Sequence, residues 1–174
     1  MSNPARRELA AQQAALARAL LGQGPVPGGF NAGRVAAMAE TLAHKRLHAA
    51  ARAWPLLARQ LGDAWAVRFA ATCAGTPLPP HHGPLLDGWR VAEVLEGEGL
   101  LGPAATRELL GARLRFRRGP EEGLQPRTGA WAWALARSAE GRCLALRLAG
   151  RTFSVWLPGR RAPSPPPPAS SPPT

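Results

Sequence analysis

The residues of this chain that could bind a metal ion or act as a nucleophile are four histidines and two cysteines. His44 and His48 stand four residues apart on a predicted helix, a spacing that lets two imidazoles face one ion, but zinc needs three or four ligands. The other candidates, His81, His82 and Cys73, come from a different segment. We therefore expect no metal and no cofactor, with the histidines on a solvated helix face and in an exposed loop.

Neither cysteine stands in the setting of a catalytic thiol. Cys73 with a histidine could form a nucleophile and its base, but the sequence places no residue that would orient the base. Cys73 and Cys143 are too few for a disulfide framework, and each is expected to be a small buried hydrophobic residue. The Gly/Pro-rich segment 24–29 lacks the lysine of a phosphate-binding loop. We predict that the protein is not an enzyme.

The charge of the chain is strongly positive. The formal net charge is +11, and such basicity favours contact with phosphate backbones. Lys45 is the only lysine, and isoleucine and tyrosine are absent, so a GC-rich coding sequence is a second explanation for the many arginines. Residues 112–157 hold nine basic and three acidic side chains, which places much of the excess in the last third of the chain.

Apolar residues recur every three or four positions up to residue 111, which predicts five to six helices. Trp54-Pro55 is the clearest boundary, because the residue before a proline leaves the helical region and the proline begins the next helix. Gly62-Asp63 predicts the end of one helix and the cap of the next. Asn31 and Asp87 are further predicted caps.

The tryptophans stand among leucines at helical or strand spacing. This pattern predicts core residues rather than platforms on which bases stack. The residues concerned are Trp54, Trp65, Trp89, Trp131 and Trp133.

After Gly111 the apolar period changes from 3.6 to 2, which predicts four short antiparallel strands with one buried face. We therefore predict an α+β fold with a helical domain over 1–111, a small four-stranded antiparallel sheet over 112–158 and a disordered Pro-rich tail over 159–174. The expected buried face consists of large side chains, namely Leu114, Phe116, Trp131, Trp133, Leu135, Leu144, Leu146, Leu148, Phe153, Val155 and Leu157.

The opposite face of this predicted sheet is the candidate partner-binding surface. An arginine-rimmed surface with an exposed tryptophan suits an acidic peptide or a nucleic acid strand. The alternative is that the helices cover this face and leave the arginines at its edge. The candidate binding residues are Arg113, Arg115, Arg117, Arg147 and Trp156, with Thr152, Ser154 and the alanines 132, 134 and 136 between them.

No apolar run approaches the roughly 20 residues that span a bilayer. The first residues lead into a charged, alanine-rich stretch without the apolar region of a signal peptide. We expect a cytoplasmic protein that contacts no membrane.

One set of short motifs carries a resemblance to a known family. The motifs are Arg46 and Arg52, then 53–57 (AWPLL), 61–63 (LGD), Phe69, 75–77 (GTP), 86–89 (LDGW) and 107–110 (RELL). The region 34–117 resembles a family whose helical N-terminal domain carries a DNA-binding label. Many of its members accompany multinuclear non-haem iron oxidases and present a ribosomally made precursor peptide for modification. Short actinobacterial-type proteins with a small C-terminal β module are still more similar.

This resemblance implies a non-catalytic adaptor that binds a peptide or a partner enzyme, such as an iron oxidase with its precursor peptide. An edge strand at 113–117 or 151–157 could take up an extended peptide by strand addition. The alternative is a nucleic-acid-binding protein that uses the same basic face of the predicted sheet.

Overall fold

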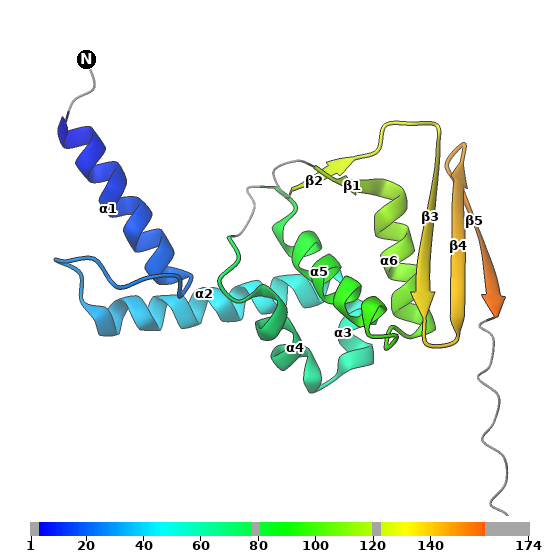
Figure 1. The fold of residues 1–174 in the computed structure, drawn as a ribbon, viewed down its shortest axis with the longest axis horizontal. Coiled ribbons are helices and arrows are strands. Elements are labelled where there is room, and N and C mark those ends of the chain that lie inside the picture. The colour runs from blue at the N-terminus through cyan, green and yellow to red at the C-terminus, as the bar shows by residue number, and fades with distance from the viewer. Residues whose placement is uncertain (1–3, 78–80, 120–122, 159–174) are drawn as a thin grey trace, which may run out of the picture.

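The computed structural model describes residues 4–77, 81–119 and 123–158, and in them six helices precede two small antiparallel sheets (Figure 1). The α+β class is therefore confirmed. The helices are α1 (Pro4–Leu20), α2 (Ala32–Ala53), α3 (Pro55–Leu61), α4 (Ala64–Cys73), α5 (Gly83–Gly97) and α6 (Pro103–Arg115). The strands are β1 (Phe116–Arg118), β2 (Leu124–Pro126), β3 (Trp131–Ser138), β4 (Gly141–Leu148) and β5 (Arg151–Pro158).

Three predicted helix boundaries are confirmed. The Oδ1 atom of Asn31 accepts a hydrogen bond from the backbone N–H of Arg34 at 3.0 Å, as a helix cap does. Pro55 is the first residue of α3. Gly62 ends that helix with a φ of 52°, a conformation that only glycine adopts without strain.

One predicted cap is confirmed only in position, and another is wrong. Asp63 is the N-cap residue of α4, but its side chain makes no cap hydrogen bond. Asp87 lies inside α5, because that helix begins at Gly83 after His82, whose φ of 58° turns the chain into it. Asp87 is fully buried, so its carboxylate serves the tertiary structure rather than the helix end.

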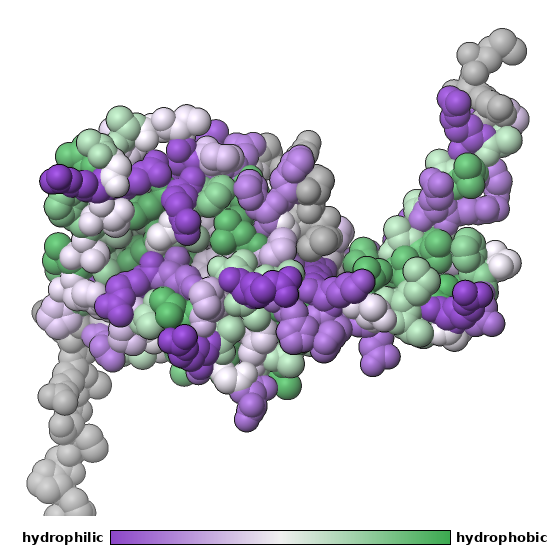
Figure 2. All heavy atoms as spheres, turned by 180° about the vertical axis from the view of Figure 1, so that it is seen from behind, coloured by the Kyte–Doolittle hydropathy of each residue, from purple (hydrophilic) through white to green (hydrophobic). Residues whose placement is uncertain are grey.

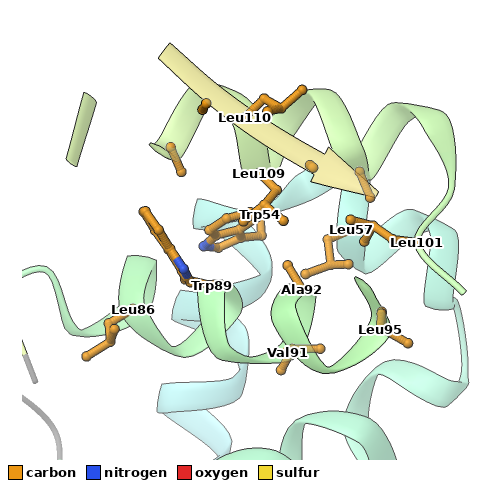
Figure 3. Close-up of a cluster of buried hydrophobic side chains, with 14 of the residues drawn as sticks. Trp54, Leu57, Leu86, Trp89, Val91, Ala92, Leu95, Leu101, Leu109 and Leu110 are labelled. Carbon is orange, nitrogen blue, oxygen red and sulfur yellow. The ribbon is translucent and has the colours of Figure 1, made fainter. Parts of the chain in front are cut away.

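The core forms where α5 packs against α2, α4 and α6, and where α3 packs against α6 (Figure 3). Trp54 is fully buried, and its indole N–H donates a hydrogen bond to the carbonyl oxygen of Leu85 at 2.9 Å. Trp65 and Trp89 are buried as well. The core position predicted for these three tryptophans is confirmed. The surrounding leucines include Leu57, Leu86, Leu95, Leu101, Leu109 and Leu110.

The predicted four-stranded sheet is divided in two. β1 and β2 form a short ribbon, and β3, β4 and β5 form a separate sheet in that order. The reason is that α6 continues to Arg115, so that Leu110 and Leu114, four residues apart, are both buried at helical spacing. Only three residues remain for β1, and they pair with β2.

The predicted domain boundary at residue 111 falls inside α6. This helix packs against β3 and β4, and buried residues of helices and sheet belong to one core. Helix α1 extends from the opposite end of the molecule, where it contacts α2 (Figure 1). The tail predicted over 159–174 lies outside the described residues. In the described part of the chain, none of the helices combines the length and apolar character that crossing a bilayer requires.

Candidate partner-binding site

The three-stranded sheet exposes the face that was expected to be buried. Trp131 and Trp133 are 63% and 58% exposed, and the large apolar residues of β4 and β5 on this face are exposed too. The predicted orientation of the sheet is therefore wrong, although the residues of β3, β4 and β5 that were predicted to share a face do share it. Leu114 and Phe116, which were predicted on the same face, lie in α6 and β1 instead. The buried face carries small side chains instead, namely Ala132, Ala134, Ala136, Cys143 and Ala145.

Helix α6 explains this orientation, because it packs across β3 and β4. Ala105 and Ala112 of α6 are buried, and alanines on both elements allow a helix to lie close to a sheet without voids. Tryptophans at positions 131 and 133 would hold the helix away. The helices thus cover the alanine side of the sheet. This agrees with the alternative in which the helices cover the face predicted to bind a partner.

The exposed face forms a continuous apolar surface. Residues directly opposite on one face of an antiparallel pair lie about 4.5–5.5 Å apart, so apolar rows run across the strands. Figure 2 shows hydrophobic side chains at the surface at the sheet end of the molecule. Contiguous exposed apolar patches occur at interaction sites of proteins, so this face is the candidate binding surface. Two rows are Trp133–Leu146–Phe153 and Leu135–Leu144–Val155.

Arginines stand at both ends of this apolar face. Arg137 lies opposite Arg142 at one end, and Arg151 lies opposite Leu148 at the other. All three arginines are exposed, and none forms an ion pair with a described residue. The face therefore combines an apolar centre with positive ends.

Side chains of the helices occupy part of the free edge of β3, near its C-terminal end. The guanidinium of Arg113 donates a hydrogen bond to the carbonyl oxygen of Leu135 at 2.7 Å. The backbone N–H of Arg137 donates to the carboxylate of Glu96, also at 2.7 Å. These bonds occupy the groups with which a further strand would pair.

The alternation of an antiparallel ladder then identifies the unpaired groups of β5. Alternate residues of a strand bond to opposite neighbours. The carbonyl of Leu135 points away from β4. The residue opposite it in β4, Leu144, therefore directs its own backbone groups toward β5, where its partner is Val155. The residues that alternate with Val155 turn their N–H and C=O groups toward the free edge, and they are Thr152, Ser154 and Trp156.

Among the described residues, this edge of β5 has little of the usual protection. Arg151 is the only charged residue of the strand, and proline occurs only at its last position. β5 is the outermost strand (Figure 1), and most of its residues are exposed. Within the described residues, β4 is its only strand partner. Proteins usually block such an edge with lysine, proline, a bulge or a covering segment, so β5 is where an incoming strand would add.

Two of the predicted binding arginines lie in α6 rather than in a strand. Arg113 is ion-paired with Glu96 at 2.6 Å. Arg115, the last residue of the helix, is exposed and donates a hydrogen bond to the carbonyl oxygen of Gly111 at 3.0 Å. The alternation of arginine with Leu114 and Phe116 suggested a strand, but burial of Leu114 follows the helical period.

Arg147 and Trp156 share one side of the sheet, as predicted, but this side faces the helices. The guanidinium of Arg147 donates to the carbonyl oxygens of Arg127 and Gly129 at 3.5 and 3.4 Å, which links it to the segment between β2 and β3. Trp156 is half-buried against the core. The structure therefore does not bring the five predicted residues together on one open surface.

Arg117 instead lies in a pocket that the sequence analysis missed. Arg113 reaches into this pocket from α6, Arg117 and Arg118 from β1, and Arg127 from the segment after β2. The cavity has a volume of about 370 Å³. Only the pairing of β1 with β2, which sequence periodicity did not reveal, brings Arg127 beside the others. Aromatic rings complete the walls, namely Trp89, Phe116 and Trp133.

The charge of this arginine pocket is partly balanced from α5. The carboxylate of Glu93 accepts a hydrogen bond from the indole N–H of Trp89 at 2.6 Å and forms an ion pair with Arg118. It also lies 3.7 Å from the guanidinium of Arg113. Glu93 therefore holds Arg113 of α6 and Arg118 of β1 in place, and the remainder of the pocket stays positive.

The histidines are arranged as expected, but they form no ligand set with a third residue. His44 and His48 are exposed on α2, with their Nε2 atoms 2.9 Å apart. The ring of His82 packs against that of Phe116, with 4.9 Å between the ring centroids. Across the described ranges, no three histidine, cysteine, aspartate or glutamate side chains come close enough to share a metal ion.

Both cysteines are buried free thiols, as predicted. Cys73 lies beside a mostly apolar cavity of about 640 Å³ that α1, α2 and α4 surround. Burial, and then the nearby negative charge of Asp87, raise the pKa of the Cys73 thiol to about 11. Burial also raises the pKa of the Cys143 thiol. Both groups are therefore thiols rather than thiolates at neutral pH.

We expect Cys73 in the native protein to react slowly with a thiol reagent. Thiolate is the nucleophile, and a pKa of about 11 lowers its population at pH ~8 by roughly 100-fold relative to an ordinary cysteine. The measurement is the rate of disulfide exchange with an aromatic disulfide in a Cys143→Ala variant, before and after unfolding in urea. A fast native reaction would show a thiolate and reopen a catalytic role for Cys73.

The motifs that carried the family resemblance have structural roles. The guanidinium of Arg46 makes two hydrogen bonds of 2.7 Å to the carboxylate of Asp87 and donates to the carbonyl oxygen of Thr76 at 2.7 Å. These residues come from three of the motifs. The hydrogen bonds to Asp87 raise the pKa of Arg46.

Glu108 connects two further motifs. Its carboxylate accepts hydrogen bonds from the backbone N–H groups of Leu56 and Leu57 at 3.2 and 2.8 Å. It thus caps α3, which begins without a side-chain cap of its own. Burial raises the pKa of Glu108, and the two backbone hydrogen bonds oppose that rise. The shared motifs therefore define a helical scaffold rather than a reactive site.

Comparison with known proteins places this scaffold in a family. Residues 10–97, about half of the chain, match the family described as SCO6045-like, C-terminal domain. A UPF0276 protein of Streptomyces avermitilis is 38% identical over 77 residues, which are 44% of this chain and 16% of that protein. The chain thus spans only a small part of the length of this relative. No solved structure matches the chain. The predicted actinobacterial-type relationship is confirmed, whereas the link to iron oxidases stays a prediction.

Proposed function

The chain belongs to the SCO6045-like C-terminal domain family, and we propose that it is a non-catalytic adaptor that binds an extended segment of a partner protein. The segment adds to β5 as a further strand of the sheet. The open edge of β5 beside the exposed apolar face carries this proposal. Hydrogen bonds to the edge provide affinity, and the apolar rows select alternate side chains of the segment.

The family resemblance supplies the candidate partners, a multinuclear non-haem iron oxidase and its ribosomally made precursor peptide. A short acidic peptide would suit this surface, because Arg137, Arg142 and Arg151 stand at the two ends of the apolar face. In this proposal the adaptor holds the peptide in extended form and leaves the chemistry to the oxidase.

The test is to place a proline at a position of β5 whose backbone N–H must donate a hydrogen bond to the incoming strand. Ser154→Pro removes an N–H group that points away from β4, and proline is tolerated on edge strands at such positions. We expect the variant to remain folded and to bind the peptide at least about tenfold more weakly, because hydrogen bonds at the edge are lost. Affinity is measured by titrating the candidate precursor peptide into the full chain and following tryptophan fluorescence.

Ser154→Ala is the matched control, since it removes the hydroxyl group and keeps the N–H. It should bind as the unaltered protein does. Equal affinity of the proline and alanine variants would rule out strand addition at β5. Binding of arbitrary oligonucleotides with a steep dependence on salt, in place of peptide binding, would favour the nucleic-acid alternative instead.

A further inference from the structure

We infer that the arginine pocket formed by Arg113, Arg117, Arg118 and Arg127 holds a carboxylate of the same partner protein. The partner would then carry an acidic side chain, or its C-terminal carboxylate, where it passes the β3 side of the sheet. This inference rests on the proposed function and specifies the chemistry of the partner.

Two of the four guanidinium groups keep donors for an incoming anion. Arg113 and Arg118 are paired with glutamates of α5. The side chain of Arg117 makes no hydrogen bond or ion pair with a described residue. Among the described residues, the side chain of Arg127 donates only its Nε–H, to the carbonyl oxygen of Phe116 at 3.2 Å. No described residue thus occupies the terminal nitrogens of Arg117 and Arg127, which can make the paired hydrogen bonds that arginine forms with a carboxylate.

Trp133 connects the pocket to the apolar face. Trp133 is one of the residues that line the pocket, and it also stands in the row with Leu146 and Phe153. Neighbouring strands lie about 4.8 Å apart, so the β3 side is about 10 Å across the sheet from β5. A partner that pairs with β5 and covers the apolar face therefore reaches the pocket with a residue outside its edge strand.

The surroundings of the pocket favour a protein carboxylate over a nucleic acid phosphate. A nucleic acid strand needs a run of cations that follows its backbone. Next to this pocket the sheet presents Trp131, Trp133 and Leu148, which are large apolar side chains. A cavity of about 370 Å³ accepts a single acidic side chain.

The test uses a small carboxylate as the probe. We expect N-acetylglutamate α-amide, which carries a single carboxylate, to shift the NMR signals of the Trp133 indole N–H and the Arg127 Nε–H in the labelled full chain, with saturation in the millimolar range. N-acetylglutamine α-amide, which has the same shape without the charge, should not shift them. Arg117→Ala with Arg127→Ala should weaken the binding of N-acetylglutamate α-amide about tenfold or more, because hydrogen bonds to a charged group are lost.

Arg34→Ala with Arg59→Ala is the matched control, because it removes the same charge from exposed positions outside the pocket. An equal loss of binding in this control would show that the probe responds only to the overall positive charge of the protein, which would overturn the inference. If a short oligonucleotide shifted the same NMR signals and bound more tightly than the carboxylate probe, the inference would be overturned, and the pocket would be a phosphate site. If the probe did not bind but Ser154→Pro weakened peptide binding as expected, the carboxylate site would be rejected and the adaptor proposal would stand.

Discussion

Replacing Asp87 with asparagine is expected to lower the free energy of unfolding by about 3–5 kcal/mol, because the change leaves a buried guanidinium without its counter-charge. Asp87 is fully buried, and both of its carboxylate oxygens lie 2.7 Å from nitrogens of Arg46. The hydrogen bonds to Asp87 raise the pKa of Arg46, and a guanidinium without such a partner is still protonated at neutral pH, so Arg46 keeps its charge in the variant. Urea unfolding followed by far-ultraviolet circular dichroism measures the effect.

Asp63→Asn is the matched control for this prediction. Asp63 is exposed and makes no cap hydrogen bond, so its replacement should change the stability by less than about 0.5 kcal/mol. A loss below about 1 kcal/mol for Asp87→Asn would show that the Arg46–Asp87 pair does not support the helical core.

Replacing Gly88 with alanine is expected to lower the free energy of unfolding by about 2–3 kcal/mol, as overpacking of a core does. A Cβ atom at position 88 would lie 2.1 Å from the Cδ1 atom of Trp54. The indole is fully buried and bonded to the carbonyl oxygen of Leu85, so the ring has no space into which it could move. The midpoint of urea unfolding again measures the loss.

Gly111→Ala provides the comparison within another helix. A Cβ atom at position 111 meets nothing within 4 Å, and alanine is the better helix former, so this variant should gain up to about 1 kcal/mol. In a Trp54→Leu background the cost of Gly88→Ala should fall, since the two sites are in direct contact. An unchanged cost in that background would show that the clash with Trp54 is not its cause.

Helix boundaries at Asn31, Pro55 and Gly62 could be predicted from the sequence because each depends on a few neighbouring residues. Proline and glycine restrict or release the backbone locally, and a capping side chain bonds to an N–H group three residues away. Asp87 could not be assigned in this way. A buried partner 41 residues earlier in the chain, Arg46, determines its role.

The sequence around residues 113–117 fits both the two-residue period of a strand and the 3.6-residue period of a helix. Arginine alternates with Leu114 and Phe116 as in a strand, yet Leu110 and Leu114 also stand one helical turn apart. Burial of both leucines in the core favours the helix. The arginine pocket could not be predicted for the same reason, because it forms only when α6 ends at Arg115 and β1 pairs with β2.

The sequence by itself determined which side chains of β3, β4 and β5 share a face, because alternation along a strand is a property of the backbone. It did not determine which face lies inside. Burial of the larger apolar side chains was the natural expectation, but α6 packs on the alanine face, where small side chains on both elements allow a close approach. Ala132, Ala134 and Ala136 therefore face α6, and the tertiary structure alone decided that the tryptophans and leucines are exposed.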